Sequence, residues 1–458
     1  MKKALITFAF ALSILVGCGG GTPPGVTSHV EGTLRVRGDV ETTGDYRDFI
    51  LTVVNQRDGD VDTLATAITD SLGAFSMTVR APEAGIYPLI VERAGQQLAL
   101  EELVVVEGDS VSISGTFPLG NRRLIIRSPE NAAWAAYRNT RGQHNQQMNA
   151  LVQGGAYTAN QLRQLMEQSS TILWSVADTY PGTMGAKTAR AESVIMLEGW
   201  NDSLVVARYT DVPLDAPILV DMVRAARRSV ARVAGQDSAV AVIRSYVARM
   251  DDGERQAALR SELVIALADS GQTDLAVQEA AELRRLHPDS QWAEWASRAS
   301  YDLENLQPGM PAPAFNLVSR TSEPVRLDDL VGTFVILEFY DPMDDGFRRN
   351  LAARNALFDA LPDELFSKVS VSVEPDSVLN DGMFDEGDHP GVFIYAPEGL
   401  ASDVAVAYNV NVVPTRFLID PDGNIMAKYV GAALSGLEQD LVSVINGLNE
   451  LARRNQGQ

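Results

Sequence analysis

The sequence predicts a multidomain chain: an N-terminal leader, a β-sandwich, an α-helical region and a C-terminal α/β domain. Short β-rich runs separated by turn residues continue to residue 118, and apolar residues then recur at intervals of three and four. From residue 307 strands alternate with helices, which is typical of an α/β sheet covered by helices. The expected domains are therefore 28–118, 129–306 and 307–453.

Residues 1–17 have the layout of a cleaved secretory signal peptide. Two lysines precede an apolar run that is too short to span a bilayer, and Cys18 follows Leu15–Gly17. The Leu-Val-Gly-Cys sequence resembles the lipobox of bacterial lipoproteins, in which the cysteine carries the lipid. The resemblance implies a cell-envelope protein anchored to a membrane through Cys18, with 18–27 as a lipidated, flexible tether. A signal peptide with an incidental cysteine is the alternative.

The absence of aspartate after Cys18 implies, by the same resemblance, the outer membrane, with the body facing the periplasm. Sixty acidic residues against 38 basic ones give a net charge of −22, which argues against nucleic acid or anionic lipid as a direct partner. Cys18 is the only cysteine of the chain, so the rest of it can form no disulfide.

The β-rich region is expected to form a small antiparallel sandwich. Its segment 69–76 resembles the hairpin of carboxypeptidase-regulatory-like and DUF4369-type domains, with Asp70 and Gly73 serving turn geometry. This region carries no catalytic constellation, and a spacer or docking surface is its expected role.

The helical region contains a helix pair over 257–287 that resembles a tetratricopeptide-type hairpin. Only one clear unit is present, so an ordinary helical hairpin is favoured. Trp292 and Trp295 could form a binding ledge, but packing is the favoured interpretation. We expect His287 to end a helix and His389 to be exposed in a loop that could flank the former active-site face. No paired metal-ligand spacing is present among the four histidines, His29, His144, His287 and His389.

In the C-terminal region the sequence pattern predicts a strand at 334–339, a helix at 346–361, and strands at 368–373 and 391–395. A helix at 402–408, an Asp-Gly hairpin turn at 422–423 and a last helix at 434–451 follow. The run at 308–315 and the run at 412–425, which contains Val-Pro-Thr, resemble thioredoxin-fold domains of the TlpA/ResA and AhpC/TSA-redoxin group.

That resemblance implies that Pro414 follows a cis peptide bond and lines a groove that binds extended peptide in redox-active relatives. Its walls would be formed by Tyr340, Met343, Val413, Pro414 and Thr415. Asp344 and Phe347 stand where the family has its two cysteines. Because the family's chemistry starts at a thiolate, we expect no catalytic residue and no cofactor in this chain.

Asp341, Asp344 and Asp345 precede the helix that follows this strand. Helix capping is the favoured explanation, since an aspartate at a helix start accepts backbone N–H bonds. A calcium-type cluster that includes Glu338 is the alternative, although the spacing is not that of an EF-hand loop. No metal site is therefore assigned.

Two functions remain open at this stage. The first is a lipid-anchored envelope protein whose redox-inactive thioredoxin-like domain binds or scaffolds a protein or peptide partner. The alternative is a thiol-disulfide oxidoreductase or redoxin of the TlpA/ResA type in the periplasm.

Overall fold

The computed structural model describes residues 25–456, except 39, 41–42, 58, 121, 156, 252, 386 and 388. The expected signal peptide and Cys18 lie outside the described residues. The chain divides into two compact units, Met1–Val233 and Ala234–Gln458, and the division lies within the predicted helical region. The three domain ranges stay a prediction.

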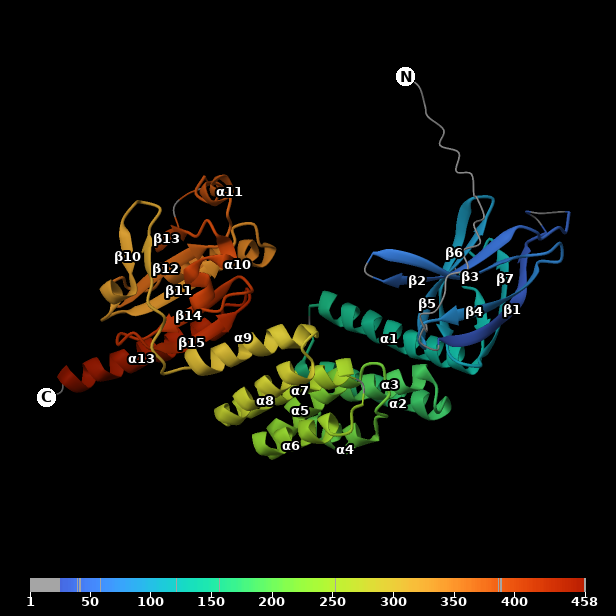
Figure 1. Ribbon diagram of the computed structural model, residues 1–458, viewed down its shortest axis with the longest axis horizontal. Helices are drawn as coiled ribbons and strands as arrows, with labels where there is room; N and C mark the ends of the chain where they lie inside the picture. Colours follow the sequence, from blue (N-terminus) through green and yellow to red (C-terminus); the bar gives the residue numbers. More distant parts are fainter. Residues whose placement is uncertain are drawn as a thin grey trace, which may run out of the picture. The chain divides into compact units, whose positions relative to one another are not determined.

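The first unit begins with two four-stranded β-sheets that pack face to face (Figure 1). One sheet has the strand order β4-β1-β7-β8 and the other β3-β2-β5-β6. The strands are β1 (Val26–Val36), β2 (Phe49–Arg57), β3 (Asp60–Ile68), β4 (Ala74–Ala81), β5 (Gly85–Arg93), β6 (Gln96–Val105), β7 (Ser110–Phe117) and β8 (Ile125–Arg127).

The expectation of a purely antiparallel sandwich is wrong at one pair, because β1 and β7 are parallel. The chain crosses to the other sheet between these strands, so β7 can return beside β1 in the same direction. The turn expected before β4 is present, but the expectation of a hairpin is wrong, because β3 and β4 belong to different sheets. In this turn the Asp70 carboxylate accepts bonds from the amides of Leu72 and Ala74, and Gly73 has a φ of +79°. That φ lies in the left-handed region, which glycine adopts without strain.

Among the described residues of the first unit, five helices follow the sandwich: α1 (Pro129–Gln153), α2 (Ala159–Thr179), α3 (Met184–Ile195), α4 (Asp202–Arg208) and α5 (Leu219–Ala234), with a 3₁₀ turn at Tyr209–Asp211. Buried Asn131 joins α1 to the sandwich. Its side chain accepts a bond from the Val104 amide at 2.9 Å and donates to the Val104 carbonyl at 3.2 Å. These two bonds fix the start of α1 against β6.

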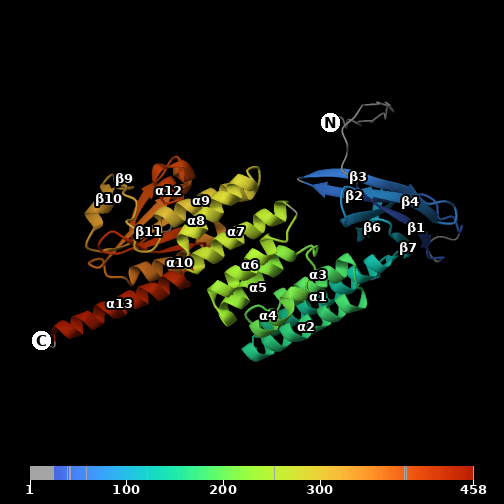
Figure 2. The ribbon, with the colours of Figure 1, turned by 60° about the horizontal axis from the view of Figure 1, so that its bottom comes forward.

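The second unit begins with four helices packed side by side in chain order (Figure 2). They are α6 (Gln236–Val247), α7 (Gly253–Asp269), α8 (Thr273–Leu286) and α9 (Gln291–Asn305). The predicted hairpin of 257–287 is present as α7 and α8, and His287 is the C-cap of α8. No helix in the described part of the chain has the length and hydropathy needed to cross a bilayer.

The unit ends in an α/β domain built on a five-stranded sheet of order β13-β12-β11-β14-β15. In this sheet β14 runs antiparallel to both β11 and β15, while β11, β12 and β13 are parallel. The strands are β11 (Phe334–Tyr340), β12 (Phe366–Ser372), β13 (Val392–Tyr395), β14 (Thr415–Ile419) and β15 (Ile425–Val430), and β9 (Asn316–Val318) and β10 (Pro324–Arg326) form a separate hairpin.

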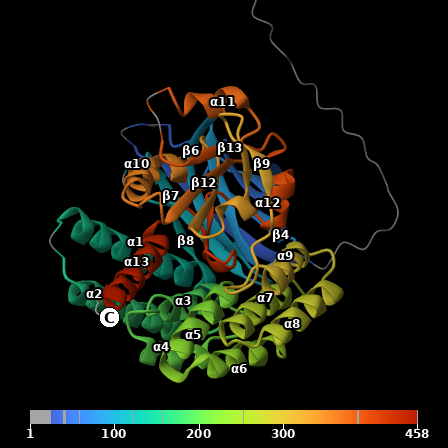
Figure 3. The same ribbon diagram turned by 90° about the vertical axis from the view of Figure 1, so that its left-hand side faces the viewer.

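Helices cover both faces of this sheet: α10 and α13 lie on one side and α12 on the other (Figure 3). The helices are α10 (Asp345–Asp359), α11 (Ser377–Gly382), α12 (Asp403–Ala407) and α13 (Ser435–Gln456), with 3₁₀ turns at Leu327–Leu330 and Gly399–Ala401. The expected strands and helices are present in the expected order, with end points that differ by a few residues, while the β9–β10 hairpin and α11 were not expected.

Helix α9 is bound to this domain by polar contacts. The Lys428 ammonium on β15 lies 2.8 Å and 2.9 Å from the two carboxylate oxygens of Asp302 on α9. Asn409 donates to the same carboxylate and to the Arg298 carbonyl. Helix α9 and the α/β domain therefore share a partly buried polar contact.

Candidate functional site

The two positions that the family resemblance assigns to cysteines lie where β11 passes into α10. Asp344 is the N-cap of α10, and its carboxylate accepts a hydrogen bond from the Phe347 amide at 2.7 Å. Asp341 accepts from the Met343 amide at 2.7 Å. Both carboxylates therefore bond the backbone of the strand-helix junction, as the capping interpretation predicts.

Phe347 occupies the second position, and it is buried. Its ring stacks on that of Tyr340, with centroids 4.7 Å apart, and both pack against Phe393. Leu351, Met383 and Phe384 complete this aromatic cluster. The position that would carry a resolving thiol in the family is thus part of a small apolar core.

The Tyr340 hydroxyl has no hydrogen-bond partner among the described residues. Burial raises the pKa of this phenol well above its usual value, so it stays protonated over the physiological range. A neutral phenol whose ring is packed on Phe347 is a core residue. It is not poised to take up a proton.

The Val412–Thr415 segment lies at the same end of the sheet's strands as the start of α10. Thr415 is paired with Phe339 near the end of β11, and the Val413–Pro414 peptide bond is cis, as expected. The Pro414 carbonyl accepts from the Gly431 amide, and a side chain at Gly346 would contact Ala432 at 3.0 Å. The structure therefore brings the strand-helix junction and the Pro414 segment together around the loop after β15.

The exposed part of this region is smaller than the predicted groove. Met343 is 47% exposed and Val412 is 48% exposed, whereas Val413 is half-buried. Tyr340, Pro414 and Thr415 are buried, and the Thr415 hydroxyl donates to the Val412 carbonyl. The expectation that Tyr340, Pro414 and Thr415 line a groove is wrong, because all three are buried in the domain interior. Met343 and Val412 are the exposed apolar residues of this region.

Below this surface lies a charge cluster that the sequence interpretation missed. The Glu338 carboxylate accepts from Arg354 on α10 at 2.9 Å and from Arg416 on β14 at 2.8 Å. All three side chains are at most 1% exposed. The signal was present, since an acid within the apolar run Phe334–Tyr340 requires a buried cationic partner.

Burial alone would raise the pKa of Glu338, but the attraction of Arg354 and Arg416 outweighs it and holds the pKa below its usual value. The Ser370 hydroxyl also donates to this carboxylate, at 3.2 Å. Glu338 is therefore ionised and fully engaged, and it is unavailable as a general base or as a ligand for a cation beside Asp344.

The alternative of a calcium-type cluster that includes Glu338 is therefore wrong. Within the described residues, no group of three or more histidine, cysteine, aspartate or glutamate side chains is arranged to hold a metal ion. The expectation that His389 is exposed is also wrong. It is half-buried, bonded to Asn355 at 2.7 Å, and its Nε2 donates to the Met383 carbonyl at 2.8 Å.

Comparison with known proteins gives partial matches only, and no family model matches the chain. The thiol-disulfide oxidoreductase ResA of Bacillus cereus is 23% identical over 132 residues, which cover 28% of this chain and 73% of that protein. A solved structure described as the thiol:disulfide interchange protein DsbE of Chlorobium tepidum shares 25% identity, with a TM-score of 0.27, and covers 30% of this chain and 98% of its own.

The thioredoxin domain of a thiol-disulfide oxidoreductase from Bacteroides vulgatus shares 22% identity, with a TM-score of 0.27, and covers 30% of this chain and 98% of its own. About three tenths of this chain is therefore similar to thioredoxin-like, ResA-type proteins. The two cysteine positions of that resemblance carry Asp344 and Phe347.

Proposed function

We propose that this protein is a lipid-anchored binding or scaffolding protein of the cell envelope whose thioredoxin-like domain carries out no thiol chemistry. One observation carries the proposal: both family cysteine positions are occupied by residues with structural roles. Asp344 caps α10, and Phe347 fills the aromatic cluster with Tyr340. Cys18 cannot substitute for them, because thiol-disulfide exchange by this fold uses two thiols at the α10 start, and a lipidated Cys18 has no free thiol.

The exposed apolar side chains of Met343 and Val412 support a binding role. Both side chains are about half exposed, at the end of the strands where the cis Val413–Pro414 bond lies. Apolar side chains that are exposed at this end of the strands offer a partner surface to bury. We propose an extended protein segment as the partner, because the family resemblance assigns peptide binding to this end of the strands.

Reduction of insulin by dithiothreitol tests the absence of redox function. We expect the chain and its Cys18→Ser variant to leave the rate at background, while a thioredoxin that retains both cysteines accelerates it. The similarity to ResA favours the alternative, a thiol-disulfide oxidoreductase. Acceleration by both the wild-type chain and the Cys18→Ser variant would establish an activity that needs no cysteine and would overturn the proposal.

Cross-linking in envelope extracts tests the binding role. Met343→Glu and Val412→Glu should each remove a specific cross-linked partner, because a charge is placed on the apolar surface. Val442→Glu is the matched control, since Val442 is 58% exposed on α13 of the same domain. Equal capture by all three variants would exclude this end of the strands as the binding surface.

The proposed anchor is tested by fractionation. Wild-type protein should sediment with outer membranes, and the Cys18→Ser variant should be released into the soluble envelope fraction, because a single acyl-bearing residue supplies the membrane affinity. Sedimentation of both would contradict lipid attachment at Cys18.

A further inference from the structure

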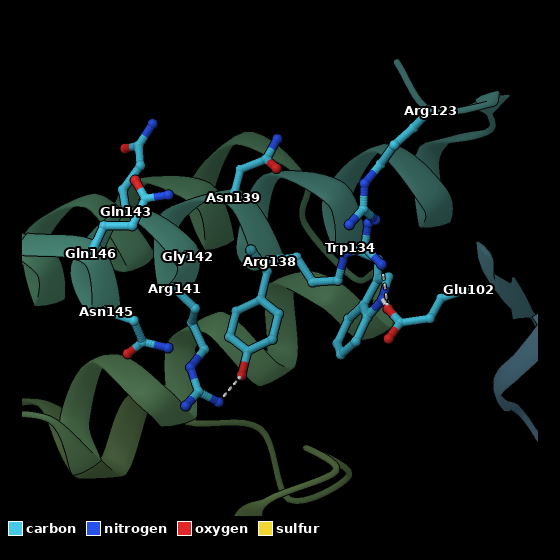
Figure 4. A pocket seen from close by; sticks show the side chains of 11 residues that line it. Glu102, Arg123, Trp134, Arg138, Asn139, Arg141, Gly142, Gln143, Asn145 and Gln146 are labelled. Atoms are coloured by element: carbon cyan, nitrogen blue, oxygen red, sulfur yellow. Dashed lines mark hydrogen bonds and ion pairs between the residues drawn. The ribbon is translucent and has the colours of Figure 1, made fainter. Parts of the chain in front are cut away.

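A polar cavity of about 750 Å³ lies along α1, at its junction with β6 (Figure 4). Eleven residues line it: two aromatics, three arginines, four side-chain amides, one glutamate and one glycine. The lining thus contains neither an aliphatic side chain nor a lysine. Its volume is within the range of small-ligand sites, ~300–1,000 Å³.

The aromatic part of the cavity is held in place by polar partners. The Trp134 indole nitrogen donates to Glu102 at 2.6 Å, and Arg138 donates to the same carboxylate oxygen at 2.7 Å. The Tyr137 ring packs against Trp134 with centroids 5.0 Å apart, and its hydroxyl accepts from Arg141. Trp134 is therefore a fixed, partly exposed aromatic surface, and a ligand would not have to order it.

Amide side chains extend this surface along the helix. Asn139, Gln143 and Gln146 lie along α1 beyond Arg138, and Arg123 and Glu102 lie at the Trp134 end (Figure 4). Asn139, Gln143 and Gln146 are exposed. Amide groups present both a donor and an acceptor, and guanidinium groups present donors in a fixed fork, so together they can bond pairs of neighbouring hydroxyls.

The charges in the cavity are balanced, which argues against a simple anion as the ligand. Arg138 is paired with Glu102, Arg123 lies 3.3 Å from Glu101, and Arg141 lies 3.5 Å from Glu192. An added anion would have to compete with three carboxylates. An uncharged ligand with many hydroxyls meets no such competition.

An extended peptide is also disfavoured. Peptides that add a strand to a sheet edge need free backbone groups there, but Asn131 already bonds the amide and the carbonyl of Val104 on the edge strand β6. An aromatic face bordered by amides and guanidinium groups suits a sugar ring, which has an apolar C–H face and hydroxyls around its edge.

We propose that this cavity binds an oligosaccharide, with Trp134 stacking against one pyranose ring and the amides of α1 bonding its hydroxyls. A second cavity of about 440 Å³ shares Glu102, Arg123 and Arg138 with the first and continues over Pro88 and Leu100 of the sheet. The two together provide room for several linked sugar units. This inference is independent of the function proposed for the α/β domain.

Calorimetric titration of the full chain with three uncharged tetrasaccharides tests the proposal: cellotetraose, chitotetraose and maltotetraose. We expect a dissociation constant below about 1 mM for at least one of them. Trp134→Ala should weaken that binding by about tenfold or more, because the stacking surface is lost. Binding of none of the three would overturn the proposal.

A second variant guards against a folding defect in Trp134→Ala. The double variant Asn139→Ala/Gln143→Ala changes only exposed amides and should weaken binding by about threefold or more. Gln147→Ala is its control, since Gln147 is exposed on the same helix and does not line the cavity. Unchanged affinity in both cavity variants, or binding of deca-glutamate in place of the sugars, would contradict the assignment.

Discussion

Replacing Glu338 by glutamine should severely destabilise the α/β domain. Glutamine has nearly the same shape, but it leaves the guanidinium groups of Arg354 and Arg416 buried with no negative charge between them. Removing one partner of a buried charge pair costs ~3–5 kcal/mol. The hydrogen bonds that would be weakened lead to a similar free energy, because Glu338 accepts two of them from arginine side chains, each worth ~1.5–3 kcal/mol.

Hydrogen exchange of peptides from β11 and β14 is the suitable assay. All five tryptophans lie before residue 307, so tryptophan fluorescence reports on other parts of the chain. A loss of ~3–5 kcal/mol lowers amide protection by roughly two to four orders of magnitude. Glu398→Gln, an exposed glutamate of the same domain, is the control and should leave protection unchanged.

The triple variant Glu338→Met/Arg354→Met/Arg416→Leu separates charge from shape. It removes all three charges, and replacing a buried ion cluster by apolar residues of similar volume is often neutral or stabilising. It should therefore recover most of the protection lost in Glu338→Gln. A fall in protection of less than about tenfold in Glu338→Gln would refute the claim that this carboxylate compensates two buried cations.

Three further predictions concern the same domain. Asp344→Ala should destabilise α10 by ~1 kcal/mol through loss of its N-cap, and Asp344→Asn should cost only a fraction of that, as hydrogen exchange of α10 would show. Phe347→Ala should cost ~3–5 kcal/mol because it empties the aromatic cluster, and Phe347→Leu should cost less; calorimetric melting measures both. Because the pKa of Glu338 is lowered in the folded state, its contribution is complete above the unfolded value of ~4.3 and is lost as the pH falls through the lower folded value. Calorimetry between pH 7 and 3 should show this loss in the wild type, and equal acid sensitivity in Glu338→Gln would contradict it.

The order of strands and helices in the α/β domain could be predicted because each element has a clear local pattern. The run Phe334–Tyr340 is almost wholly apolar, as a central strand covered on both faces must be. Asp344 could be predicted as a cap from its place before a helix. These features depend on residues that are near one another in the sequence.

The sandwich shows where local patterns are insufficient. Strand β3 (Asp60–Ile68) is an edge strand with mostly exposed or half-buried residues, so it lacks the apolar alternation that would have predicted it. The parallel pairing of β1 with β7 joins segments some eighty residues apart, as shown by the pairing of His29 with Ser110. Turn residues indicate where strands end, but they do not indicate which distant strand becomes a neighbour.

The polar sites were the hardest to predict. Arg354 is one of several charged residues on α10, and only the three-dimensional fold shows that it is the one directed to Glu338. The cavity along α1 depends on Glu102 of β6, which lies 32 residues before Trp134 in the chain. No spacing rule connects these two positions.

The contact between Lys428 and Asp302 determines how the α/β domain should be isolated. A fragment that starts at residue 307 would keep the Lys428 ammonium, which is only 18% exposed, and discard the carboxylate that neutralises it. The same fragment would lack both acceptors of the Asn409 side-chain amide, the Arg298 carbonyl and the Asp302 carboxylate. A fragment that starts ahead of Gln291 keeps all of these groups. We expect this fragment, and not the shorter one, to crystallise or give well-dispersed spectra.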